Sequence, residues 1–416
     1  MSLLARAEQV ARRVTDRLTD DGRRERLMRS LAAATSKPAV NVWRPSGLSL
    51  GGAGLAVMCA AFGEVFPGQE WEVTGHRQLT DVVAEIGSSH LDASLFTGMV
   101  GAAAAVSLSS ADGTRYQGLS GHLDALMLPA MRRLAEDAPP GPHTYDVVHG
   151  MAGWAGYLRT RPRSSEVEGA ARAVAHALAR VLGDGEPHRM SRRRTRPGQA
   201  AETVVDCGLA HGAGGVLAAL SLLETHFGFG DGEIACAIRR GGHWLAAQAR
   251  TVDGQILWPD AVARDPAPAD ERPLHAGSWC HGSSGVARAV YLAGVAADEA
   301  GLRDLAVDAM RGHCRRYPEL ASPSVCHGLA GQVLLALAFA YDTREPVFVT
   351  AAGRLAERLH HRYRDGFPLG FREVEGDGGA EVDHPGLLRG AQGIALTLLA
   401  AHLGRPPRWG RLLLLW

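Results

Sequence analysis

Apolar runs alternate with amphipathic segments along most of this chain. The run that begins at Gly328 is apolar on nearly all sides, which predicts a buried inner helix. Between residues 166 and 182, apolar residues such as Val167 and Val174 recur on one face and charged residues such as Arg172 on the other. That pattern predicts an outer helix that covers the core. Each unit of the pattern therefore predicts one inner and one outer helix.

A Gly-x-x-Gly motif opens the apolar run of each unit, and the motif occurs seven times. The first glycines are Gly51, Gly98, Gly150, Gly212, Gly282, Gly328 and Gly390. One such motif carries little information, because glycine is common in this chain. Seven motifs that open similar runs are strong evidence for a repeat architecture.

The last repeat, residues 385–400, is as apolar as the repeats in the middle of the chain. Open solenoids usually end in polar capping repeats, so this pattern favours a closed ring. We therefore predict an all-α fold, an α/α toroid of seven inner and seven outer helices. It forms a single domain over residues 1–416, with residues 1–35 as leading helices. Closure would place all seven glycine turns at one end of the inner layer.

Three longer insertions interrupt the repeats and could roof a cavity at that end. Residues 184–199 are basic, and residues 251–273 are rich in turn-forming residues. Residues 363–384 are rich in glycine and acidic side chains. The basic segment fits either a solvated loop or a patch that docks a peptide.

Composition bounds the class of protein. The 416 residues are 46% hydrophobic and 21% charged, as in ordinary globular proteins. Lys plus Arg and Asp plus Glu both number 44, which gives no electrostatic case for nucleic acid or a membrane surface. We expect no transmembrane helix, because no apolar stretch is long enough. The N-terminus does not read as a secretory signal. Six scattered cysteines indicate a reducing compartment, so we expect a cytoplasmic protein.

Two successive repeats have a cysteine at the same position before the motif glycine. Cys280 lies two residues before Gly282, and Cys326 lies two residues before Gly328. His327 lies one residue before its glycine, and neighbouring repeats would bring all three side chains together. Two thiolates and one imidazole suit Zn²⁺, and three protein ligands leave the open fourth position typical of catalytic sites.

Other interpretations of these cysteines stay open. Free cysteines are often small core residues, so Cys280 and Cys326 could serve packing alone. Cys207 precedes the turn at Gly212 and is a weaker alternative ligand. A thiolate-rich zinc site would favour either activated water or a bound substrate thiol, whose pKa the metal lowers.

Two further side chains lie on the same predicted rim. His211 directly precedes Gly212, and Asp146 lies four residues before Gly150. Either could move a proton, and histidine is better matched to neutral pH. A structural role for each is the alternative.

These motifs resemble those of the lanthionine synthetase C-like family. The resemblance covers nearly the whole chain. It rests on the seven glycine motifs, Asp-Val-Val-His-Gly at Asp146, Gly-Leu-Ala-His-Gly at Gly208, Trp-Cys-His-Gly at Trp279 and Cys-His-Gly at Cys326. The family implies an α/α toroid with zinc at one end, held by Cys280, Cys326 and His327. It implies His211 and Asp146 as acid–base residues.

The family's reaction adds a cysteine thiol to dehydroalanine or dehydrobutyrine of the same peptide, which makes a lanthionine or methyllanthionine ring. The resemblance thus implies a zinc-dependent cyclase that acts on a dehydrated precursor peptide in lanthipeptide antibiotic biosynthesis. A dehydratase and a transporter complex are the implied partners. They could place the protein at the inner membrane surface.

The sequence departs from the family at two places. Relatives often carry Arg four residues before the first zinc cysteine, and Ala276 stands there, with Arg272 and His275 nearby. His281 stands where some relatives have Tyr. A zinc-containing scaffold that binds thiols or peptides without turnover is therefore the main alternative. A toroidal glycosidase is less favoured, because such enzymes use paired carboxylates and the rim carries only Asp146.

Overall fold

The structure is a computed structural model. It describes residues 1–36, 38–68, 70–110, 113–183, 187–195, 201–264, 274, 277–317, 319–375 and 379–416. The chain divides into two compact units, each described here by itself. The first unit is Met1–Leu123 with Glu319–Trp409, and the second is Asp124–Pro318 with Gly410–Trp416. The expectation of a single domain over 1–416 stays a prediction.

A helix begins directly after the first glycine of each repeat, as the pattern predicts. These inner helices are α3 (Gly52–Val65), α5 (Met99–Ser109), α8 (Met151–Leu158), α10 (Ala213–Phe227), α12 (Ser283–Ala296), α14 (Leu329–Thr343) and α16 (Ala391–Leu403). They are buried on almost every side; α8, for example, has no exposed residue.

An amphipathic outer helix follows six of the inner helices along the chain. These are α4 (Trp71–Ser88), α6 (Gln117–Glu136), α9 (Ser165–Leu182), α11 (Gly232–Ala247), α13 (Ala300–Arg315) and α15 (Pro346–His361). Helix α9 buries the predicted apolar face, and its N-cap is Ser164, whose hydroxyl accepts a hydrogen bond from the Val167 N–H. The outer helix predicted for residues 166–182 is thus confirmed.

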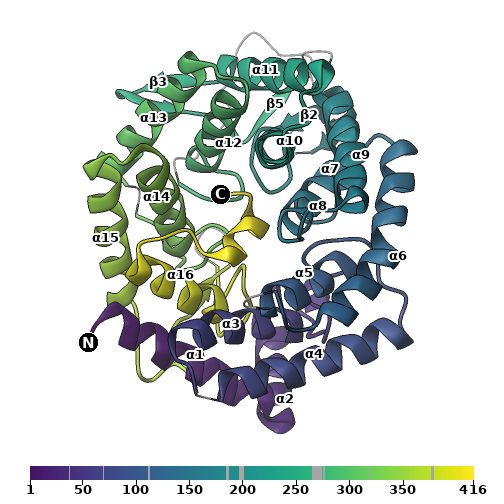
Figure 1. Ribbon diagram of the computed structural model, residues 1–416. Coiled ribbons are helices and arrows are strands. Elements are labelled where there is room, and N and C mark those ends of the chain that lie inside the picture. Colours follow the sequence, from purple (N-terminus) through teal and green to yellow (C-terminus); the bar gives the residue numbers. More distant parts are fainter. Residues whose placement is uncertain are drawn as a thin grey trace. The chain divides into compact units, whose positions relative to one another are not determined.

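The seventh inner helix pairs with the start of the chain. Helix α1 (Leu3–Thr19) packs against α16 within the first unit (Figure 1). Its buried face includes Val10, Val14 and Leu18. Residues 1–35, predicted as leading helices, form α1 and α2 (Asp21–Ala34), and α1 takes the outer position of the seventh repeat.

Close backbone approach explains the repeated glycines. A Cβ atom on Gly212 would lie 2.4 Å from the carbonyl oxygen of Asp206, and one on Gly215 would lie 2.2 Å from that of Leu209. Such distances are far inside van der Waals contact. Only glycine therefore lets the loop fold tightly back on the start of its helix.

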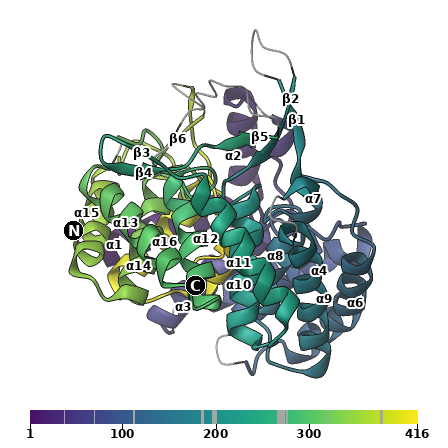
Figure 2. The same cartoon turned by 90° about the horizontal axis from the view of Figure 1, so that it is seen from above.

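The insertions contain short strands. Antiparallel strands β1 (Arg192–Arg194), β2 (Glu202–Asp206) and β5 (Ala261–Ala263) form one sheet of the second unit, at one end of its helices (Figure 2). The other pairs are β3 (Arg250–Val252) with β4 (Gln255–Leu257), and β6 (Glu373–Val374) with β7 (Glu381–Val382).

Acidic residues pair with two arginines of the basic insertion. Arg192 forms an ion pair with Asp206, and Arg194 forms one with Asp260, each with a nitrogen–oxygen distance of 2.8 Å. Much of the charge in residues 192–194 is thereby compensated within the fold. The rest of the basic insertion lies partly outside the described residues.

The C-terminal residues are buried in the second unit. The Trp279 Nε1–H donates to the Leu413 carbonyl at 3.0 Å, and Arg288 Nε donates to the Leu415 carbonyl at 2.9 Å. Trp279 stands directly before Cys280, so the tail helps to fix the loop that carries this cysteine.

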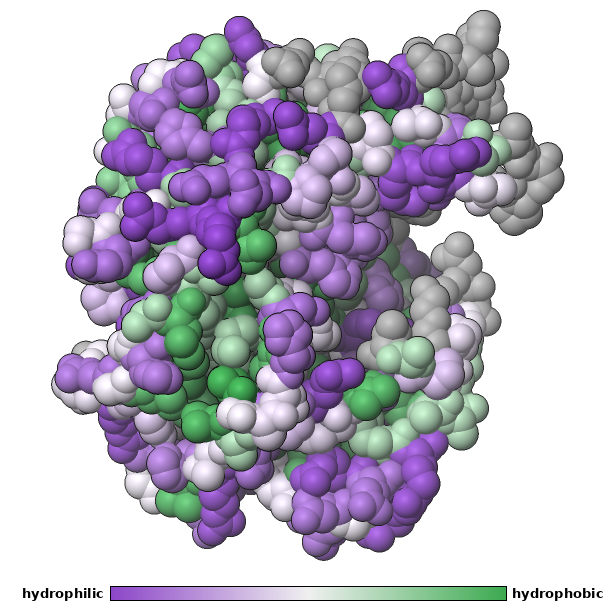
Figure 3. Space-filling model, turned by 90° about the vertical axis from the view of Figure 1, so that its right-hand side faces the viewer, coloured by the Kyte–Doolittle hydropathy of each residue, from purple (hydrophilic) through white to green (hydrophobic). Residues whose placement is uncertain are grey.

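Hydrophilic and hydrophobic residues are interspersed on the face shown in Figure 3. Exposed apolar side chains include Leu126 and Leu134 of α6. Within the described parts of the chain, none of the helices combines the length and the apolar character needed to cross a membrane.

Candidate metal centre and acid–base pair

Backbone hydrogen bonds join the helix-start loops of neighbouring repeats. In the second unit the Val147 N–H donates to the Ala210 carbonyl, and the Ala210 N–H donates to the Cys280 carbonyl, both at 3.0 Å. In the first unit the Cys326 N–H donates to the Leu388 carbonyl at 2.9 Å. Ala210, Cys280, Cys326 and Leu388 each lie two residues before a motif glycine. The equivalence of these positions, inferred from the sequence, is therefore also structural.

Asp146 is the centre of a cluster in the second unit. Its side chain is fully buried, and Oδ1 accepts the backbone N–H groups of His149 at 2.6 Å and Gly150 at 3.0 Å. Its Oδ2 lies 2.8 Å from His211 Nδ1. The structure thus joins the two predicted acid–base residues directly.

Hydrogen bonds keep this buried carboxylate ionised. Burial raises the pKa of Asp146, but hydrogen bonds from His149 and His211 outweigh burial, and the net pKa lies well below the ordinary value. An ionised carboxylate only accepts hydrogen bonds, so the Nδ1 of His211 carries the proton in this pair. The Nε2 atom is then the nitrogen of His211 that can exchange a proton with a substrate.

His281 and Cys280 lie on the next loop of the same unit. The His281 ring stacks on the His211 ring with a centroid separation of 5.8 Å. The Ser278 hydroxyl accepts the His281 N–H at 3.1 Å and lies 3.7 Å from Cys280 Sγ. Cys280 is 7% exposed. The same serine therefore contacts the Cys280 thiol and the backbone of His281.

His327 in the first unit contacts a carboxylate that the sequence analysis did not single out. Its Nε2 lies 2.5 Å from Glu373 Oε1. Glu373 is 2% exposed and lies in β6, within the acidic insertion. Ser322 Oγ donates to Glu373 Oε2 at 2.7 Å, and Ser324 Oγ donates to Oε1 at 3.4 Å. The pair fixes the orientation of the imidazole beside Cys326.

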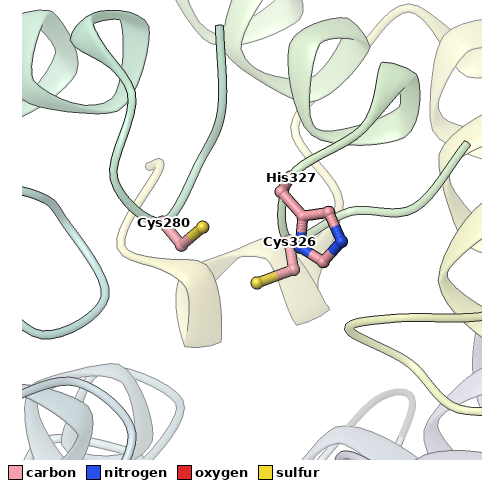
Figure 4. A group of neighbouring side chains, drawn as sticks. All are labelled: Cys280, Cys326 and His327. Carbon is pink, nitrogen blue, oxygen red and sulfur yellow. The ribbon is translucent and has the colours of Figure 1, made fainter. Parts of the chain in front are cut away.

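The predicted ligands Cys280, Cys326 and His327 constitute a possible metal-binding group. Figure 4 draws Cys280 on the loop before α12, and Cys326 and His327 as consecutive residues on the loop before α14. The group offers two sulfur atoms and one ring nitrogen. Cys207 is buried and belongs to none of the metal-binding groups found among the described residues.

The positions of the first departure from the family, the missing arginine, lie outside the described residues. These are Ala276, Arg272 and His275.

The sequence analysis missed Glu373, because this residue has no equivalent position in the other repeats. The only available signal was the acidic character of its insertion.

Among the solved structures that the chain resembles is one that it matches over nearly the whole length of both chains. That structure is a nisin cyclase with a TM-score of 0.73 and 19% sequence identity, and the match covers 94% of this chain and 97% of the other. At this identity the likeness shows the fold, and it confirms the predicted helical toroid as the fold class. No curated protein matches the chain. The family model for lanthionine synthetase C-like proteins matches residues 42–414, so the chain belongs to the lanthionine synthetase C-like family.

Proposed function

We propose that this protein is a zinc-dependent peptide cyclase of the lanthionine synthetase type. It adds cysteine thiols of a precursor peptide to dehydroalanine or dehydrobutyrine residues of the same peptide, which forms thioether rings. Membership of the family and the fold of nisin cyclase support this class of activity. The observation that carries the proposal is the Cys280, Cys326 and His327 group, which occupies equivalent helix-start positions in a chain of this family.

The donor set fits zinc. Two thiolates and one imidazole are preferred zinc ligands, and three protein ligands leave a fourth position for a substrate. The contact between His327 Nε2 and Glu373 would leave the opposite nitrogen, Nδ1, for the metal. A carboxylate on the far nitrogen of a ligating histidine fixes its tautomer and orientation. Zinc bound here would keep the thiol of a substrate cysteine ionised at neutral pH.

His211 and Asp146 provide the proton that the reaction needs at the α-carbon. The substrate sulfur bonds to the β-carbon of the dehydro residue, and the electrons of the double bond move toward the carbonyl as an enolate. The α-carbon must then gain one proton, which balances the proton that the thiol lost. His211 supplies this proton through Nε2, while Asp146 holds Nδ1–H and stabilises the imidazolium form.

The partners follow from this chemistry and remain proposals. The substrate is a dehydrated precursor peptide, so a dehydratase must act first. An association with a transporter complex at the membrane and a cytoplasmic location are further expectations of the same proposal.

Metal content and cyclisation together test the proposed function. We expect about one zinc per purified chain, as three protein ligands imply. Cyclisation leaves the mass of a dehydrated peptide unchanged but removes its free thiols, so alkylation followed by mass spectrometry measures it. Zinc binding without thiol loss would favour the scaffold without turnover. Native protein without zinc, purified under conditions that retain metal, would refute the proposal.

A further inference from the structure

Three imidazoles face one oxygen of Asp146. Oδ2 lies 3.5 Å from His143 Nδ1, 3.5 Å from His149 Nδ1 and 2.8 Å from His211 Nδ1. The proton chemistry proposed for this carboxylate uses only His211. The proposed proton transfer therefore does not use the ring nitrogens of His143 and His149.

These two histidines are accessible from solvent. Their side chains are 74% and 45% exposed, whereas the Asp146 side chain is fully buried. Their rings meet edge to face with a centroid separation of 4.9 Å. One ligand atom from each of His143, Asp146 and His149 lies within 4.8 Å of the others. An ion from solution can thus reach a ready group of two nitrogens and one oxygen.

We propose that His143, Asp146 and His149 form a second, weaker site for a divalent transition metal, and that occupation of this site inhibits the enzyme. Two imidazoles and one carboxylate suit Zn²⁺, Co²⁺ and Ni²⁺, with water in the remaining positions. The site lacks thiolates and lies in contact with water, so its affinity is lower than that of the cysteine site.

Inhibition follows from the atom that the metal would use. Asp146 Oδ1 is engaged by two backbone N–H groups, so the metal would bind Oδ2. Oδ2 is also the atom that holds His211 Nδ1. A cation at Oδ2 therefore displaces or repels a protonated His211, which removes the proposed proton donor. This second step rests on the proposed function, whereas metal binding does not.

Titration of the full chain, loaded with one zinc, measures the second site directly. Equilibrium dialysis should detect a second Zn²⁺ in the wild type, and His143→Ala and His149→Ala should each weaken it by at least about tenfold. Cys326→Ala should lose the tight zinc and keep the weaker one. Co²⁺ at the second site should lack the sulfur-to-metal charge-transfer absorption of a thiolate site.

A matched control comes from the other histidine and carboxylate cluster of the second unit. His176, Asp231 and Glu233 also form a possible metal group at the surface. His176→Ala should leave the second zinc in place. Loss of that zinc in His176→Ala, or its retention in both His143→Ala and His149→Ala, would overturn the assignment.

The inhibitory role has its own readout. Cyclisation by the wild type should fall as free Zn²⁺ rises above one equivalent, and cyclisation by His143→Ala should resist the same concentrations. Equal inhibition of both proteins would refute the regulatory step. A failure of the proposed function looks different, because Cys326→Ala would then keep its tight zinc.

Discussion

His211 and His327 occupy the same position in two repeats, directly before the motif glycine, and yet their surroundings differ. Both side chains are 34% exposed, and both contact a buried carboxylate. Asp146 binds His211 through Nδ1, whereas Glu373 binds His327 through Nε2. The carboxylate therefore decides which nitrogen of each ring is left for chemistry.

The neighbouring residues separate the two roles further. Cys326 directly precedes His327, whereas Ala210 directly precedes His211. Of these two histidines, only His327 therefore follows a cysteine. Asp146 comes from the adjacent repeat, whereas Glu373 comes from an insertion. Under the proposed function, the same repeat position serves the metal through His327 and the proton through His211, and each histidine has a different carboxylate as its partner.

The largest expected effect is loss of the metal. Cys326→Ala removes one of three ligands, so zinc should be lost and cyclisation should fall by more than the roughly 10²–10⁴-fold typical of a missing acid or base. Elemental analysis and the alkylation assay measure the two effects. Cys314→Ala is the control, because Cys314 is a buried cysteine that contacts Tyr317 and belongs to none of the metal-binding groups found among the described residues. Full zinc in Cys326→Ala would show that the ligand set is wrong.

Replacement of His211 should separate the two histidines. His211→Ala should keep its zinc and lose about 10²–10⁴-fold in the rate of cyclisation, because only the proton donor is removed. His122→Ala, an exposed histidine of α6, should change neither quantity. If His211→Ala lost zinc, the proposal that His327 binds the metal and His211 transfers the proton would be wrong.

A smaller effect is expected at Glu373. Glu373→Gln removes the charge that orients His327, so zinc affinity should fall about 10–100-fold, as measured by competition with a chelator. The control is Glu375→Gln, two residues further along. Glu375 accepts hydrogen bonds from Thr35 and Arg389. Equal zinc affinities in Glu373→Gln and the wild type would leave Glu373 with a purely structural role.

Glu373 also marks the limit of what the sequence predicts. The glycine motifs predicted the inner helices, because each glycine is imposed by a local backbone contact, as at Gly212. The same motifs aligned Cys280 with Cys326 and His211 with His327. Glu373 follows no repeat, and its partner Ser322 is 51 residues away, so only the folded chain reveals the contact.

The sequence predicted leading helices over residues 1–35, but for a related reason it did not show that one of them is the seventh outer helix. Helix α1 packs on α16, and the two lie at opposite ends of the chain. The amphipathic pattern of α1 predicts a helix but contains no information about its partner. The short strands of the insertions also depend on pairing between distant segments, as in β2 with β5.

The smallest expected effect concerns stability and pH at Asp146. Its folded-state pKa is lowered, so the charged carboxylate stabilises the fold above its ordinary pKa of 3.8, and this contribution is lost as pH falls below that value. Asp146→Asn should cost about 1–3 kcal/mol at neutral pH, because the amide keeps only one of the two acceptor oxygens and carries no charge. Denaturant unfolding in the Cys326→Ala background, where zinc release does not contribute, measures both proteins. The gap between them should narrow in acid, and a gap that stays constant down to strongly acidic pH would mean that the Asp146 carboxylate does not carry its charge in the folded protein.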